Sequence, residues 1–187
     1  ALVVKYSSTG TLLSSVYVNY NMGNNSAYDG AVALMSDNSI VVIHQMYNDV
    51  RDESNEVLVT KLDSDLNMVW QQFIGYYDND SWSSPDDGIS VVVDPATDEI
   101  LIAWDSSENS NIINDDAVVL VKLDTDGQVL WKRIFGIHES DSGVNGYQNG
   151  NKALSIHGDK FTIVIEQQSD GIYNITSLRD GSERSVK

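Results

Sequence analysis

The stretch that decides the fold runs from Leu120 to Trp131 and reads Leu-Val-Lys-Leu-Asp-Thr-Asp-Gly-Gln-Val-Leu-Trp. An apolar run leads into a short polar turn, and a second apolar run leaves it. The glycine of the turn supplies a positive φ without steric cost, while Asp and Thr suit tight turns. The β-branched and aromatic residues on both sides fit a pleated sheet. The stretch therefore predicts a β-hairpin whose turn lies at Asp124–Gly127.

The same pattern occurs three times along the chain. The lysine of the hairpin, Lys122, recurs about 60 residues earlier at Lys61 and again at Lys5. No stretch shows a sustained helical period, and each repeat predicts four short strands. Anchors in constant order at a fixed period indicate a repeat architecture. The predicted strands are 1–6, 12–20, 57–62, 67–74, 88–94, 99–104, 117–123, 128–135, 152–157, 160–167, 171–178 and 182–187.

Two tryptophans hold the same position in their repeats. Trp70 and Trp131 each follow the hairpin turn, and the first repeat has Ser14 there. We expect each indole to pack between neighbouring sheets and to bury ~200 Å² of ring surface. The alternative is an exposed ring that stacks on a ligand. Packing around Ser14 should be weaker.

The repeats resemble a known family. Residues 120–131, followed by Ile134-Phe135-Gly136, are similar to the bacterial and protist β-propeller repeat, which reads roughly Val-Val-Lys-Leu-Asp-x-x-Gly-x-x-x-Trp-x-x-x-x-Gly. Residues 59–63, with Trp70 and Gly75, resemble it too. The hairpin is also similar to the tryptophan-docking repeat of quinoprotein propellers and to the Asp-box of sialidases. The resemblance implies an all-β fold, a propeller-like array of four-stranded antiparallel blades with Gly127 as a structural turn residue.

The family's strand order divides the chain unevenly. An outer half-blade at 1–20 would precede blades at about 29–75, 88–136 and 149–187. About three and a half blades cannot close a ring, since propellers have typically 4–8. An open array exposes sheet faces and edges. We therefore expect either a part of a longer chain or assembly with copies of itself, as a ring or a filament.

Composition excludes several partners. The formal net charge is −17 without a basic stripe, which argues against nucleic acid and anionic lipid. No apolar run is long enough for membrane insertion. The absence of cysteine excludes disulfides, thiolate metal sites and cysteine nucleophiles. Asn24, Asn79 and Asn174 begin glycosylation sequons, so glycans are expected if the protein is secreted by a glycosylating cell.

No catalytic constellation is found, because the three histidines lack metal spacing and no nucleophile elbow or phosphate loop occurs. Calcium is the one candidate cofactor. Asp63, Asp65, Asp124 and Asp126 recur at the same hairpin and offer oxygen ligands. The alternative is that they are turn residues. In a propeller, the polar segments 48–56, 76–87, 105–116 and 137–150 would carry a binding surface; otherwise they are solvated connections.

These observations favour a non-enzymatic module that is extracellular or on the cell surface. It would act as a structural, adhesion or filament subunit, with copies of itself or further repeats of a longer chain as partners. The alternative is a propeller domain of a larger secreted hydrolase or dehydrogenase, whose catalytic residues lie outside this chain.

Overall fold

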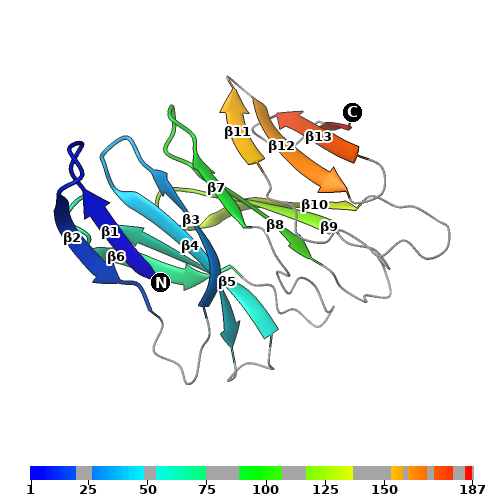
Figure 1. The fold of residues 1–187 in the computed structure, drawn as a ribbon. Coiled ribbons are helices and arrows are strands. Elements are labelled where there is room, and N and C mark those ends of the chain that lie inside the picture. The colour runs from blue at the N-terminus through cyan, green and yellow to red at the C-terminus, as the bar shows by residue number, and fades with distance from the viewer. Residues whose placement is uncertain are drawn as a thin grey trace.

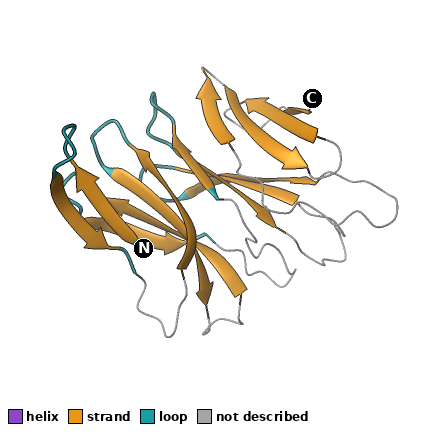
Figure 2. Cartoon of the chain, in the orientation of Figure 1, coloured by secondary structure: helices purple, strands orange, loops and turns teal. Residues whose placement is uncertain are grey.

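The computed structural model describes residues 1–19, 27–48, 54–74, 89–106, 117–136, 153–157, 160–167, 171–178 and 184–186. These residues form fourteen strands and no helix (Figures 1 and 2). The prediction of an all-β fold is therefore confirmed for this part of the chain. The strands are β1 (Leu2–Tyr6), β2 (Leu12–Tyr17), β3 (Ala27–Leu34), β4 (Ile40–Asn48), β5 (Ser54–Leu62), β6 (Met68–Phe73), β7 (Ser90–Val93), β8 (Ile100–Ser106), β9 (Ala117–Leu123), β10 (Val129–Gly136), β11 (Ala153–His157), β12 (Lys160–Gln167), β13 (Gly171–Leu178) and β14 (Arg184–Val186).

The strands pair in chain order into four antiparallel sheets. The first sheet has two strands, β1 and β2, and each of the others has four: β3–β6 in the second, β7–β10 in the third and β11–β14 in the fourth. Four-stranded antiparallel sheets are thus confirmed. Strands that are neighbours along the chain are also neighbours in each sheet, so each sheet is a simple meander. No helix long and apolar enough to cross a membrane is found among the described residues.

The sheets are stacked face to face, and side chains alternate between the two faces of each strand. In β8, Ile100, Ile102 and Trp104 pack in a cluster with residues of the second sheet. The intervening Leu101 and Ala103 pack with residues of the fourth sheet. The third sheet is therefore covered on both faces. A smaller cluster joins the first sheet to the second.

The first strands of successive four-stranded sheets lie side by side. β3 contacts β7, and β7 contacts β11 (Figure 1). Stacked sheets whose first strands meet along one line are compatible with a propeller. The described residues do not form a closed ring.

The two ends of the sheets differ. The tight turns at 7–11, 35–39, 63–67 and 124–128 lie at one end, and the strand ends that flank 49–53 and 107–116 lie at the other, as antiparallel pairing requires. Most of 48–56 and 105–116, and all of 76–87 and 137–150, lies outside the described residues. The prediction of a binding surface there stays a prediction.

Candidate functional site: the contacts between successive sheets

Each outer hairpin begins with one side chain that accepts the turn's own N–H groups. Asp63 Oδ1 accepts hydrogen bonds from the backbone N–H groups two and four residues ahead, at 2.9 and 2.8 Å. Asp124 Oδ1 makes the same pair at 3.0 and 2.8 Å. Ser7 Oγ replaces the carboxylate in the first sheet, at 3.3 and 3.0 Å. The three turns thus share one construction, which is the side-chain turn that Asp and Ser favour.

The fourth position of each turn has a positive φ. The angle is 82° at Gly10, 69° at Leu66 and 87° at Gly127. A leucine is uncommon in this region, because its Cβ crowds the backbone. The common backbone angle shows that the second turn keeps its conformation despite the unfavourable residue type.

A lysine from each of the first two sheets contacts the turn of the next sheet. Lys5 Nζ donates to the Ser64 carbonyl oxygen at 2.7 Å, and Lys61 Nζ donates to the Thr125 carbonyl oxygen at 3.2 Å. Ser64 and Thr125 hold the same position in their turns. The repeated lysine is therefore a contact between sheets.

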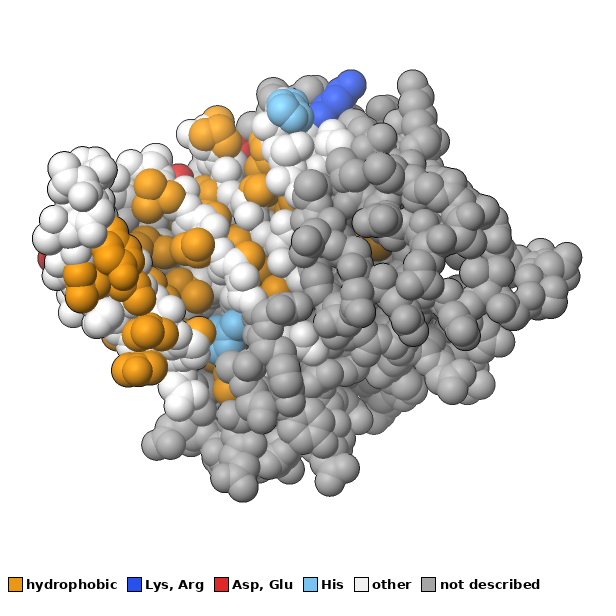
Figure 3. Space-filling view, in the orientation of Figure 1, with side chains coloured by type: hydrophobic (Ala, Val, Ile, Leu, Met, Phe, Trp, Pro, Cys, Tyr) orange, Lys and Arg blue, Asp and Glu red, His pale blue; other side chains and the backbone are white. Residues whose placement is uncertain are grey.

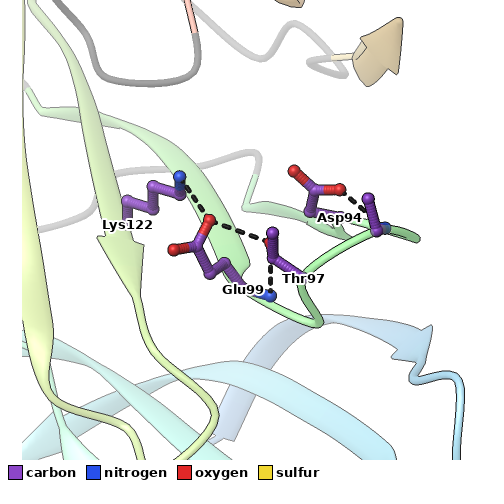
Figure 4. A network of polar contacts seen from close by, with 5 residues as sticks. Asp94, Thr97, Glu99 and Lys122 are labelled. Carbon is purple, nitrogen blue, oxygen red and sulfur yellow. Dashed lines mark hydrogen bonds and ion pairs between the residues drawn. The ribbon is translucent and has the colours of Figure 1, made fainter. Parts of the chain in front are cut away.

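The third lysine of the repeat has a different described partner. Lys122 Nζ forms an ion pair with Glu99 Oε2 at 2.6 Å, and the same oxygen accepts a hydrogen bond from Thr97 Oγ1 at 2.9 Å (Figure 4). This network lies within the third sheet, between β9 and the β7–β8 turn. The corresponding turn of the fourth sheet, at 179–183, lies outside the described residues.

The indole of Trp70 lies between the second and third sheets. Its Nε1 donates to the Thr125 carbonyl oxygen at 3.1 Å, so that one oxygen accepts from both Lys61 and Trp70. Gln72 Nε2 donates to the carbonyl oxygen of Gly127. A Cβ on Gly127 would lie 2.9 Å from Gln72 Nε2 and 3.3 Å from the Trp70 ring. Gly127 therefore provides both the positive φ and the space for the indole.

Trp131 holds the equivalent strand position in the third sheet. Its ring is stacked on Phe161 of the fourth sheet, with centroids 5.9 Å apart and an interplanar angle of 29°. The Arg133 guanidinium lies 5.8 Å from the Trp131 centroid. Both tryptophans are partly buried against clusters that join neighbouring sheets.

Strand register aligns the first sheet with the other two. Ser14 pairs with Lys5 just as Trp70 pairs with Lys61, and Lys122 with Trp131. The first contact thus lacks an indole. Leu66 is instead 4% exposed, in the cluster that joins the first and second sheets. The first contact thus has a large residue at the turn position and a small one at the strand position, and the second contact has the reverse.

Two of the four candidate calcium ligands, Asp63 and Asp124, accept the hydrogen bonds of their own turns. The Oδ2 of Asp63 accepts from Asn67 Nδ2 at 2.9 Å, and these hydrogen bonds lower the pKa of Asp63 below its usual value. The side chains of Asp65 and Asp126 are exposed. Within the described ranges no three His, Cys, Asp or Glu side chains are grouped as metal ligands would be. Calcium binding thus stays a prediction without support from these contacts.

One of the described histidines is buried. His44 in β4 is 1% exposed, and neither ring nitrogen has a hydrogen-bond partner among the described residues. Burial, with a smaller contribution from the charged N-terminus, lowers its pKa to about 4. His157 Nε2 lies 3.2 Å from Ser155 Oγ. His138 lies outside the described residues, and nothing in the strand pattern predicted a buried imidazole at 44.

The structure describes only one of the three sequon asparagines. Asn24 and Asn79 lie outside the described residues, and Asn174 lies within β13, of which only the backbone is described. Their glycosylation stays a prediction.

A cleft of about 550 Å³ lies between the second and third sheets. Its described lining includes Gln72, Trp104 and Lys132 and contains no carboxylate, histidine or hydroxyl side chain. Trp104 Nε1 is buried there and has no hydrogen-bond partner in the part of the chain that the structure describes. The described lining therefore offers no carboxylate or histidine for an acid–base couple.

Comparison with known proteins adds no relative: no protein-family model matches the chain, and no curated protein matches its sequence.

Proposed function

We propose that the chain is a non-enzymatic structural and interaction module of the β-propeller type, which acts by stacking its sheets on further sheets of its own kind. The further sheets are supplied by copies of the chain or by more repeats. The module is extracellular or on the cell surface. One comparison of equivalent residues supports this proposal.

The comparison concerns the face of β1 that points away from the second sheet. Leu2 and Tyr6 are 52% and 59% exposed there, and Val4 between them is also exposed. The equivalent residues of β5 and β9 are at most 1% exposed, because the preceding sheet covers them. Those residues are Leu58, Thr60 and Leu62 in the second sheet and Val119, Val121 and Leu123 in the third.

The open face is apolar and carries no carboxylate. Figure 3 shows hydrophobic side chains gathered over the region where β1 and β2 lie in Figure 1. Residues 1–28 contain no Asp or Glu, although the whole chain has a net charge of −17. Among the described strands, β1 also has a partner on one edge only. An exposed apolar face beside an open edge favours association with another sheet.

The test is the mass of the purified chain in solution, measured by light scattering over a range of concentrations. We expect species larger than the 20.6 kDa monomer. The double variant Leu2→Ser, Tyr6→Ser should shift them to monomer. Met68→Ser is the matched control, because Met68 is 63% exposed on the second sheet and lies away from this face. A folded parent that stays monomeric throughout would contradict the proposed assembly.

The extracellular part of the proposal has its own test. The chain is expressed in a secreting, glycosylating cell, and peptides with Asn24, Asn79 and Asn174 are examined by mass spectrometry. We expect glycan mass on at least one of them. Three unmodified sequons on secreted protein would count against this part.

A further inference from the structure

The first sheet carries a turn built like the turns that receive a neighbouring sheet. Residues 7–11 have the same side-chain acceptor and the same positive φ as 63–67 and 124–128. Ser8 stands where Ser64 and Thr125 stand in the later turns, and the carbonyl oxygen of each of those two accepts a lysine from the preceding sheet. The turn at 7–11 thus has the shape of a lysine acceptor.

The glycine of this turn has open space beside it. A Cβ placed on Gly10 meets no described atom within 4 Å, whereas at Gly127 the same position is crowded by Trp70 and Gln72. In the second turn the corresponding residue is Leu66, whose side chain packs in the core opposite a strand without tryptophan. Gly10 therefore matches the turn that receives an indole.

We propose that the turn 7–11 and the exposed face of β1 are a docking surface for a β-sheet of the same repeat type that presents a lysine and a tryptophan, as Lys61 and Trp70 do on the second sheet. The lysine would donate to the carbonyl oxygen of Ser8, and the indole would cover Gly10. The apolar side chains of the incoming sheet would cover Leu2 and Tyr6. This inference rests on the proposed function and adds the chemistry of the partner.

The interface that already exists between the second and third sheets argues for this occupant. It is the same surface, two repeats later, with the donor sheet in place. The fourth sheet of a second copy matches less well, because β13 and β14 contain neither lysine nor tryptophan. The surface therefore fits a repeat of the kind formed by β3–β6.

The test is a fusion that supplies such a sheet. Residues 27–117 are duplicated in front of Ala1, so that the copied β8 continues into β1 in the register that it has with β9. The copied Lys61 and Trp70 should then reach the turn 7–11. The matched control changes only these two copied residues, to Met and Ala. A second fusion, with residues 89–171 in front of Ala1, supplies Lys122 and Trp131 instead and gives β1 the register that β13 has with β12.

The readout is amide hydrogen exchange of residues 2–11. We expect exchange to slow at least tenfold in both fusions relative to the parent, and the control should lose most of that protection in 7–11. Unchanged exchange in folded fusions would overturn the inference, and so would two fusions that fail to fold where the parent folds. Equal protection in the control would also overturn it, because the pair would then be unnecessary.

The outcomes separate this inference from the proposed function. If the parent is monomeric and the fusions are protected, the proposed self-assembly is wrong and the docking surface is supported. If the parent associates through Tyr6 and the fusions are not protected, the proposed assembly is supported and the occupant of the surface is a second copy.

Discussion

Two contacts between sheets can be compared, that of the first sheet with the second and that of the second with the third. They use lysines at equivalent repeat positions but differ in packing. In the first contact the strand position is Ser14, which pairs with Lys5, and the turn residue Leu66 packs in the cluster between the two sheets. In the second, Trp70 faces a turn with Gly127. Each pair combines one large and one small residue. The comparison indicates that the volume shared by strand and turn is kept, while the residue that supplies it changes.

Removing the indole should have the largest effect. Trp70→Ser gives the second contact the small strand residue of the first contact but not its large turn residue. It therefore leaves a cavity and removes the hydrogen bond to the Thr125 carbonyl oxygen. We expect a loss of about 3 kcal/mol in the free energy of unfolding. Chemical denaturation measures it. A loss below about 1 kcal/mol would show that the indole is not a main contact between these sheets.

Acid should loosen the first contact rather than the second. Val42, two residues before His44 on the same face of β4, packs against the first sheet, so His44 faces that sheet. Its folded pKa of about 4 lies below the unfolded value of 6.5. The unfolded chain therefore binds this proton first, and stability falls as pH decreases from about 6.5 to 4.

Between pH 7 and pH 5 we expect a loss of about 2 kcal/mol from this residue. His44→Leu should remove that loss. The lowered carboxyl pKa values of Asp37 and Asp63 act below pH 4, outside this interval. Denaturation curves at the two pH values, for parent and variant, measure the difference. The same pH slope in both proteins would show that His44 is not responsible.

Two glycine substitutions should separate backbone strain from crowding. Gly10→Ala and Gly127→Ala meet nearly the same positive φ, 82° and 87°. The alanine at 10 has open space, and the alanine at 127 must displace Gln72 and the Trp70 ring. We expect losses of about 1 kcal/mol at position 10 and about 2 kcal/mol at position 127. Equal losses would mean that the indole does not need the glycine.

Local chemistry allowed much of the fold to be predicted. Residues 120–131 contain the sequence signals for a turn and for both flanking strands, and β9 and β10 form there. Leu66 departs from this chemistry, because nothing in its own turn favours leucine at a positive φ. Its side chain packs in the cluster that joins this sheet to the first one, and no local pattern contains that information.

The candidate surface was harder to predict than the strands. Leu2 in β1 and Leu58 in β5 occupy the same repeat position with the same residue type, but one is 52% exposed and the other fully buried. Periodicity shows which face is apolar, and only the presence of a neighbouring sheet decides whether it is covered. The buried His44 was missed for a related reason, since its burial comes from packing between sheets.

The central claim is that strand and turn residues compensate each other in size at the two contacts whose turns the structure describes, and a double-mutant cycle on the second contact tests it most directly. Trp70→Ser, Gly127→Leu and the double variant are compared with the parent by chemical denaturation. We predict that the double variant is more stable than the sum of the single losses by at least about 1 kcal/mol, because the leucine introduced by Gly127→Leu fills the space of the indole, just as the contact with Ser14 has Leu66 at its turn. Additive losses would contradict the account.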